Sequence, residues 1–178
     1  ASGGGVQNLG FAYTIYNQNG PATLDTACAS RQVILPAETI GALSVQRKVF
    51  VPDNDAFARW LNVFTNTSGS SVSFNMIASN NLGSDSNTTI VSSSSGDAAA
   101  TTADLWVTTF QNFSGTTSSD PRLGHVLAGP GAPTPVSGIN FANGDDNPFW
   151  SYSMTLAPGE TRIIANFVAV QASRADAN

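Results

Sequence analysis

The feature that most constrains the fold of this chain is an alternation of apolar and polar side chains with a period of two. In residues 71–79, for example, Val72, Phe74, Met76 and Ala78 would share one face of a strand. Similar runs recur along the chain, separated by segments rich in Gly, Pro, Asn and Asp, which favour turns. We predict strands over residues 11–16, 31–35, 39–51, 57–65, 71–79, 88–94, 103–110, 123–129, 149–156 and 161–171.

Three turn signals make this prediction more specific. The segments 66–70 (Asn-Thr-Ser-Gly-Ser) and 157–160 (Ala-Pro-Gly-Glu) each join two predicted strands. In the second segment, Pro presets φ and Gly accepts positive φ, and in the first, turn residues follow and precede strand patterns. Each segment therefore predicts a hairpin whose two strands are antiparallel neighbours. Pro36 cannot donate a ladder hydrogen bond and therefore marks a strand end or edge.

Helix-favouring residues are scarce. Charged residues make up 11% of the chain, with a single lysine, Lys48, and two glutamates, Glu38 and Glu160. We therefore predict an all-β fold, a two-sheet antiparallel β-sandwich, with a jelly roll or a closed β-barrel as the alternative. The length of 178 residues fits a single domain over residues 1–178, in which 172–178 would be a tail or a domain-boundary segment.

Charge and cysteine content limit the classes of partner, the redox chemistry and the location that we expect for this chain. The net charge of −5, with seven scattered basic residues, offers no footprint for nucleic acid, and no apolar run is long enough for membrane insertion. Cys28 is the only cysteine, so we expect no intrachain disulfide and a small buried side chain rather than a reactive thiol. Little Lys and abundant Ser, Thr, Asn and Gly are typical of secreted or cell-surface β proteins, so we expect that location.

The inventory of reactive residues argues against an enzyme. His125 is the only histidine, so a zinc site of nitrogen and sulfur ligands has too few members, and a Ser-His-Asp arrangement has one possible base. No Gly-x-Ser-x-Gly elbow is present. The aspartates fall in predicted loops or at strand ends, where Asp caps backbone amides. We expect His125 to be structural or on the surface, and both it and Cys28 to be dispensable for activity.

Two kinds of binding site remain open. Calcium binds oxygen ligands alone, and two segments could supply them, one with Asp85 and Asn87 and the other with Asp145 and Asp146, although turn chemistry also explains both. We expect no other cofactor. Trp150 and Tyr152 share a face of one predicted strand, where they would form either a sugar-stacking platform or part of the core.

Three further features bear on surfaces. Residues 129–147 are too long for a tight turn and are the first place to look for a binding surface. Asn66, Asn87 and Asn112 begin Asn-x-Ser/Thr sequons, which matter only in a host that glycosylates secreted proteins. With a single lysine to guard its sheet edges, the chain is expected to cover them with loops or with a neighbouring subunit, and Phe11, Tyr13 and Ile15 are the candidates for a donated assembly strand.

Four segments carry a resemblance. Residues 31–36 (RQVILP), 45–52 (VQRKVFVP), 82–85 (LGSD) and 156–161 (LAPGET) resemble β-sandwich modules of large bacterial cell-surface and secreted proteins. The resemblance implies a role in surface architecture, adhesion or self-assembly. Our leading hypothesis is therefore a non-catalytic structural or interaction module of an extracellular bacterial protein, such as a subunit or repeat of a surface assembly. The alternative is a carbohydrate-binding module with a polysaccharide partner.

Overall fold

Strands dominate the computed structural model, which describes residue 16, residues 20–111 and residues 122–171. No α-helix occurs in this part of the chain, and two single turns of 3₁₀-helix lie at Thr26–Cys28 (η1) and Asp85–Asn87 (η2). The strands are β1 (Thr23–Asp25), β2 (Gln32–Ile34), β3 (Glu38–Ile40), β4 (Leu43–Phe50), β5 (Phe57–Asn66), β6 (Val72–Ser79), β7 (Thr88–Ser93), β8 (Trp106–Gln111), β9 (Arg122–Val126), β10 (Gly138–Asn140), β11 (Phe149–Leu156) and β12 (Thr161–Gln171).

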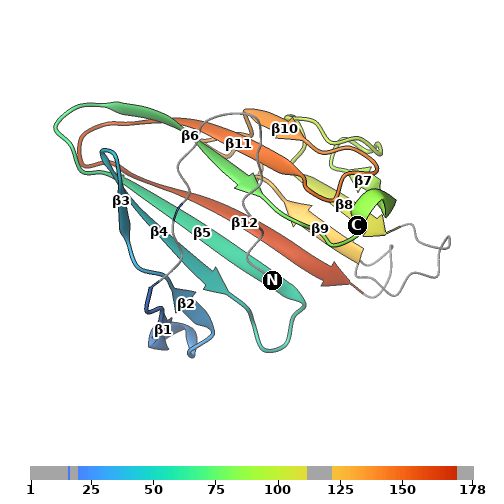
Figure 1. Cartoon of the computed structure of the whole chain (residues 1–178), viewed down its shortest axis with the longest axis horizontal. Coiled ribbons are helices and arrows are strands. Elements are labelled where there is room, and N and C mark those ends of the chain that lie inside the picture. Colours follow the sequence, from blue (N-terminus) through green and yellow to red (C-terminus); the bar gives the residue numbers. More distant parts are fainter. Residues whose placement is uncertain (1–15, 17–19, 112–121, 172–178) are drawn as a thin grey trace.

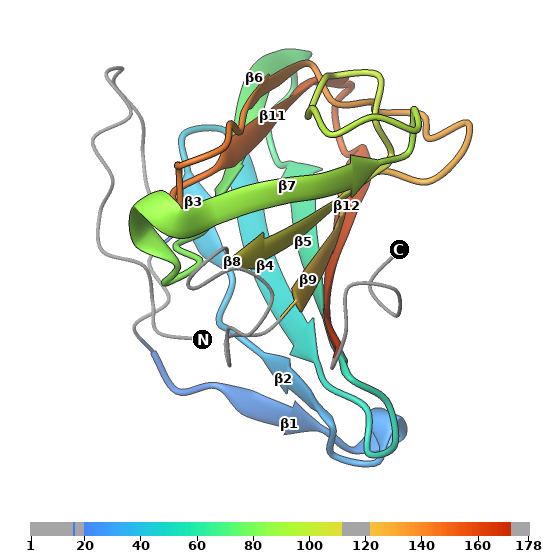
Figure 2. The same ribbon diagram turned by 90° about the vertical axis from the view of Figure 1, so that its right-hand side faces the viewer.

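The strands form two antiparallel sheets of unequal size. The large sheet has the order β1-β2-β4-β5-β12-β9-β8-β7, with β3 also paired to β4, and the small sheet has the order β10-β11-β6. Figures 1 and 2 show the small sheet lying as a second layer over the large one. The predicted two-sheet sandwich is thus confirmed, and the alternative of a closed barrel is not what forms.

The core lies between the two layers, where alternate side chains of both sheets point inward. β11 contributes Trp150, Tyr152, Met154 and Leu156, all at most 6% exposed, which is the period-two pattern predicted for this strand. The ring centroids of Phe64 on β5 and Phe74 on β6 lie 5.2 Å apart, so this pair of rings connects the large sheet with the small one. Burial of these apolar side chains is the main favourable term in the stability of the fold.

Most strand positions agree with the sequence prediction, and those at residues 149–156 and 161–171 agree residue for residue. The prediction of one strand over residues 39–51 is wrong, because the chain forms two strands there, β3 and β4, which pair with each other. Gly41 lies in the two-residue connection with φ of 59°, a conformation that glycine adopts without strain. Pro36 lies between β2 and β3, as expected of a strand boundary.

The two predicted hairpins are also wrong. β5 and β6 belong to different sheets, and so do β11 and β12, so the segments 66–70 and 157–160 cross from one layer to the other. A period-two pattern is the same for two strands that pair side by side and for two strands that stack face to face. The turn residues were recognised correctly, but their sequence does not say in which direction the second strand leaves.

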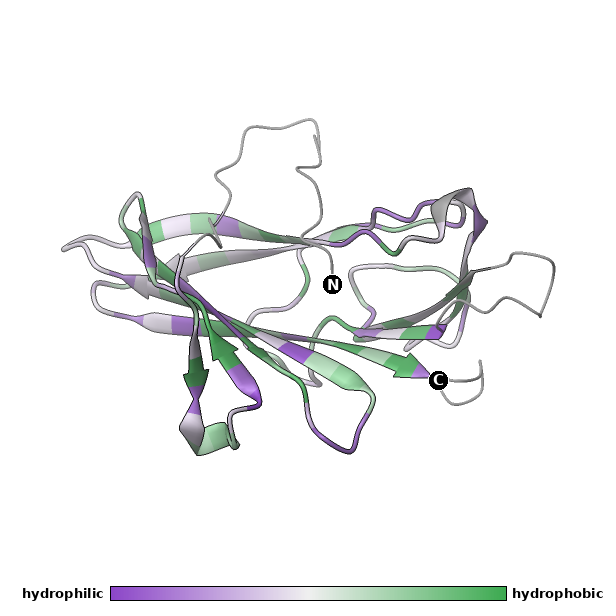
Figure 3. Cartoon of the chain, turned by 60° about the horizontal axis from the view of Figure 1, so that its bottom comes forward, coloured by the Kyte–Doolittle hydropathy of each residue, from purple (hydrophilic) through white to green (hydrophobic). Residues whose placement is uncertain are grey.

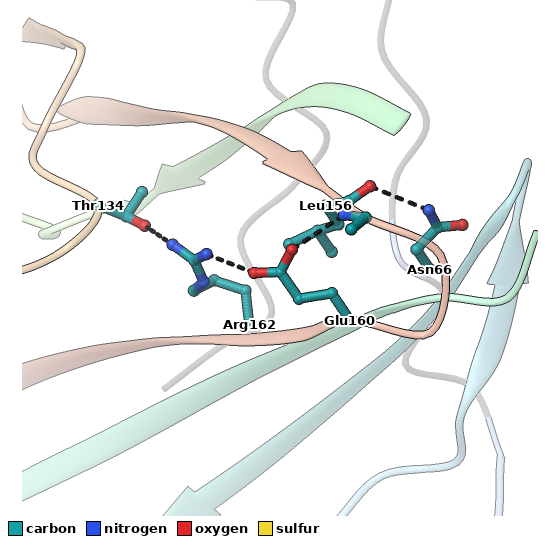
Figure 4. A network of polar contacts seen from close by, with 6 residues as sticks. Asn66, Thr134, Leu156, Glu160 and Arg162 are labelled. Atoms are coloured by element: carbon teal, nitrogen blue, oxygen red, sulfur yellow. Dashed lines mark hydrogen bonds and ion pairs between the residues drawn. The ribbon is translucent and has the colours of Figure 1, made fainter. Parts of the chain in front are cut away.

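The two crossings are tied together by Asn66, which is 1% exposed. Its side-chain amide donates to the carbonyl oxygens of Ser70 and Leu156, at 2.7 and 3.0 Å. Its backbone N–H donates to the carbonyl of Glu160, and its carbonyl accepts from the N–H of Gly159. Figure 4 shows the hydrogen bond from the Asn66 amide to the Leu156 carbonyl. Near it, at the same end of the sandwich, Arg162 bridges Glu160 and Thr134. One buried side chain therefore fixes both connections between the layers.

Replacing Asn66 with Ala should destabilise the fold by about 2–4 kcal/mol, because two buried carbonyl oxygens would lose their donor. Urea unfolding followed by circular dichroism would measure the change. The matched control is Asn140→Ala, at an exposed position of β10, which should stay within about 0.5 kcal/mol of the native chain. Equal losses in the two variants would contradict the structural role assigned to Asn66.

The long segment 129–147 covers the core rather than forming an open surface loop. Val136 and Phe141 are each 6% exposed and belong to the core, and β10 within it pairs with β11. Thr134 accepts a hydrogen bond from the Arg162 guanidinium at 3.0 Å. The segment thus extends the small sheet and closes one side of the sandwich.

Candidate functional site

His125 lies on β9 with its side chain pointing into the core, where it is fully buried. Its Nε2 lies 3.0 Å from Thr109 Oγ1, and its ring meets the rings of Phe141 and Trp150 edge-on at centroid distances of 5.7 and 6.3 Å. Nδ1 has no hydrogen-bond partner among the described residues. Burial lowers the pKa of His125 to about 4, so the ring is neutral at physiological pH. Reactants in solvent do not reach this side chain.

The buried histidine should make stability depend on pH. An unfolded chain binds a proton at this ring below about pH 6.5, whereas the folded chain binds it only near pH 4. The unfolded state therefore holds more protons between these values, and stability falls as the pH is lowered through them. We expect a loss of about 2 kcal/mol between pH 7 and pH 5, measured by urea unfolding at each pH.

The control for this prediction is His125→Gln, which keeps a polar group near Thr109 but does not titrate. This variant should be less stable than the native chain at pH 7, and its stability should change little between pH 7 and pH 5. Buried carboxylates with a lowered pKa, such as Asp104, lose their contribution only below about pH 4 and do not obscure the window. The same slope in both proteins would rule out His125 as its source.

Two carboxylates, those of Asp104 and Glu160, accept several hydrogen bonds from neighbouring groups of the fold. Burial alone would raise the pKa of Asp104, but hydrogen bonds from the N–H and hydroxyl of Thr101, from Ser94 Oγ and from the N–H of Ser95 hold it well below its usual range. Glu160 accepts from the N–H of Ala157 and from the Arg162 guanidinium, and both contacts lower its pKa. Neither carboxylate is set up to take up a proton near neutral pH.

The two segments predicted as calcium candidates lie side by side. The N–H of Leu82 donates to the carbonyl of Asp146 at 2.8 Å, and the N–H of Gly144 donates to the carbonyl of Thr88, also at 2.8 Å. Asp85 and Asn87 form η2 in one segment. Asp145 and Asp146 lie in the other, where Asp145 Oδ1 accepts from the N–H of Asn147 and Asp146 Oδ1 accepts from its side-chain amide.

These contacts are those of turns that hold two loops together. Across the described ranges, no group of three or more His, Cys, Asp or Glu side chains is placed to hold a metal ion. Sequence reasoning treated the two segments separately and could not foresee that tertiary structure brings them together. Of the sequons noted in the sequence, the one at Asn66 begins with a buried side chain. Both hydrogen atoms of its amide are donated to carbonyls, so a glycan has no access there.

Trp150 and Tyr152 lie in the core and not on a surface. They are 4% and 1% exposed, and Tyr152 OH donates to the carbonyl of Leu127 at 2.6 Å and accepts from Asn166 at 2.7 Å. Of the two interpretations of this aromatic pair, the structure therefore supports packing rather than sugar stacking at these positions. Cys28 is half-buried at the end of η1. The assembly candidates Phe11, Tyr13 and Ile15 lie outside the described residues.

The surface with the most distinctive character is the outer face of the large sheet, on β4, β5 and β12. The ring of Phe57 lies 6.3 Å from that of Phe50 and 5.9 Å from that of Phe167, so three half-buried rings follow one another across three strands. Ile163 on the same face is 52% exposed. Figure 3 shows hydrophobic stretches along these strands. We call this surface, defined by Phe50, Phe57, Phe167 and Ile163, the outer aromatic face.

Polar groups border the outer aromatic face on one side. The Arg59 guanidinium stacks over the Phe50 ring at 4.9 Å and donates to Gln32 Oε1 at 2.8 Å. Gln32 in turn donates to Asp25 Oδ2, which ties β1 and β2 to the face. Lys48, the single lysine, lies two residues before Phe50 on the same face of β4. None of β4, β5 and β12 presents an acidic side chain on this side.

Sequence reasoning missed this face because it assigned one face of each strand to the core and the other to solvent. A signal was present, since both strands carry apolar residues on both faces. On β5, Trp60 and Phe64 alternate with Phe57, Leu61 and Val63, and on β12, Ile164 and Val168 alternate with Ile163, Ala165 and Phe167. A strand that is apolar on both faces is expected to be covered on both, or to present one of them to a partner.

The chain matches no protein-family model, and no curated protein matches it. Among solved structures, a polysaccharide lyase resembles it in fold, with a TM-score of 0.52 and 16% identity over 83% of this chain. The chain spans 22% of the length of that lyase. The shared feature is the β-sandwich, which in the lyase is one part of a much longer protein.

Two further solved proteins are less similar. A candidate aldose 1-epimerase from Klebsiella pneumoniae gives a TM-score of 0.44 at 10% identity, over 82% of this chain and 52% of its own. A candidate kojibiose phosphorylase from the human microbiome gives a TM-score of 0.36 at 9% identity, over 72% of this chain and 18% of its own.

In the described ranges, no helix is long and apolar enough to cross a membrane.

Proposed function

We propose that the chain is a non-catalytic interaction module of an extracellular bacterial protein, and that its outer aromatic face binds carbohydrate. The observation that carries this proposal is the row formed by Phe50, Phe57 and Phe167, whose rings remain half-exposed while the other chemically distinctive side chains serve the fold. An apolar row on the outer face of a sheet is a surface that a partner can cover.

Carbohydrate suits this face for chemical reasons. The apolar face of a sugar ring packs on aromatic side chains, and its hydroxyls need polar partners at the border. Lys48 and Arg59 lie beside the rings and carry N–H groups that could donate to such hydroxyls, and Gln32 holds the Arg59 guanidinium in place. The fold that the chain shares with part of a polysaccharide lyase is in keeping with this ligand class.

The absence of catalysis is part of the same proposal. His125 is enclosed in the core, and Asp104 and Glu160 are engaged in hydrogen bonds that keep them ionised. General acid–base chemistry requires a group that meets the substrate and changes its protonation state near the working pH. We assign neither property to these three residues.

A binding panel tests the proposal. Native chain is run in gels that contain soluble polysaccharides, neutral and acidic, and retardation gives an affinity. Phe57→Leu keeps an apolar side chain but removes the central ring. It should weaken binding about two- to tenfold, because an aromatic contact is worth about 0.5–1.5 kcal/mol beyond its area.

Phe74→Leu is the matched control, since it removes a half-buried ring from β6 on the other sheet. It should leave retardation unchanged. If no polysaccharide retards the native chain, or if both variants lose binding equally, the proposed carbohydrate function is wrong and the structural role in a surface protein is favoured.

A further inference from the structure

Every sandwich leaves strand edges open, and the edges of this one differ in how they are protected. An open edge is a template for another strand, and proteins usually guard it with charge, Pro, a bulge, a covering loop or short length. Three edge strands, β1, β3 and β10, have three residues each. Strands of this length offer little backbone for pairing.

The remaining edge of the large sheet, β7, is guarded in two ways. Its pairing with β8 is shifted by a bulge between Ile90 and Ser92. On its other side, the N–H of Ile90 donates to Asn143 Oδ1 at 2.7 Å, and the carbonyl of Thr88 accepts from the N–H of Gly144 at 2.8 Å. Residues 143 and 144 thus occupy the positions that an incoming strand would need.

Within the described ranges, β6 at the edge of the small sheet has none of these protections. It is eight residues long and contains no charged residue, Pro or Gly. All eight residues pair with β11 without a bulge, and no backbone hydrogen bond joins residues 72–79 to any other described part of the chain. Figure 1 shows β6 at the border of the small sheet, next to β11. By the rules of edge protection, β6 is the most exposed template in the described fold.

The two faces of β6 are suited to pairing with a copy of itself. Val72, Phe74, Met76 and Ala78 point toward the core, and Ser73, Asn75 and Ser79 point outward and are exposed. In a two-fold antiparallel pair centred on Asn75, Phe74 faces the partner's Met76, and Asn75 faces the partner's Asn75. Inward side chains then meet inward ones, no like charges meet, and the interface is the same on both copies.

We propose that two copies of this chain associate through antiparallel pairing of their β6 edges, which joins their small sheets into one continuous six-stranded sheet. Backbone hydrogen bonds supply affinity, and the match of inward and outward faces sets the register. This interface is separate from the outer aromatic face, so self-association and carbohydrate binding are tested, and can fail, independently.

Like charges at the two-fold axis give the sharpest test. Asn75→Lys would place two lysines opposite each other, with Cβ atoms about 5 Å apart, on an exposed face that does not enter the core. Ser153→Lys on β11 is the matched control, because Ser153 pairs directly with Asn75 and shares its hydrogen bond but lies one strand away from the edge. Both variants add one charge and remove the same contact.

Sedimentation over a range of concentrations measures the dimer. We expect native chain and Ser153→Lys to dimerise with the same dissociation constant, and Asn75→Lys to dimerise at least about tenfold more weakly. Mixing Asn75→Lys with Asn75→Glu should restore a mixed dimer, because opposite charges then meet at the axis. Hydrogen exchange should show protection, on dimerisation, of those β6 amides that point away from β11.

Three results would overturn the proposal. The first is a native chain that stays monomeric at the highest concentration reached. The second is a dimer that Asn75→Lys and Ser153→Lys weaken equally. The third is a dimer in which the β6 amides pointing away from β11 exchange as fast as in the monomer. Unfolding curves of each variant, measured alongside, show whether the variant is still folded, so that loss of the dimer through misfolding is recognised.

Discussion

The architecture depends on one constraint, namely that two sheets of unequal size must be joined through turns that cross between the layers. Both crossings, at residues 66–70 and 157–160, lie at the same end of the sandwich, and the buried amide of Asn66 bonds to carbonyl groups of each. With these ends fixed, β11 lies with its apolar side chains against β5 and β12. The core, the pairing of the short β10 with β11 and the position of β6 at the edge of the small sheet all follow from that placement.

The same packing explains where the chemically distinctive residues lie. His125, Trp150 and Tyr152 point inward because they occupy positions on β9 and β11 whose side chains project from the face of the sheet that packs in the core. Asp104 and Glu160 stabilise loops and a turn. Both carboxylates therefore serve to satisfy backbone N–H groups of the fold.

Two such surfaces stand out, and they are of different kinds. The outer aromatic face offers side chains across three strands, whereas the β6 edge offers backbone groups along one strand. Recognition by a face depends on ring geometry and border hydrogen bonds, and recognition by an edge depends on register. The outer aromatic face lies on the large sheet and the β6 edge on the small one, so the two surfaces belong to different layers of the sandwich.

The sequence by itself determined the all-β class, the positions of most strands and the turns between them, because periodicity and turn chemistry are local properties. The residues 149–156 and 161–171 illustrate this, since their bounds as strands were predictable from alternation alone. Only the tertiary structure decided that these two strands stack across the core rather than pair, that the loops around Asp85 and Asp146 meet, and that Phe50, Phe57 and Phe167 align. These facts depend on contacts between residues far apart in the chain, and a local pattern of side chains carries no information on which distant strand will lie beside it.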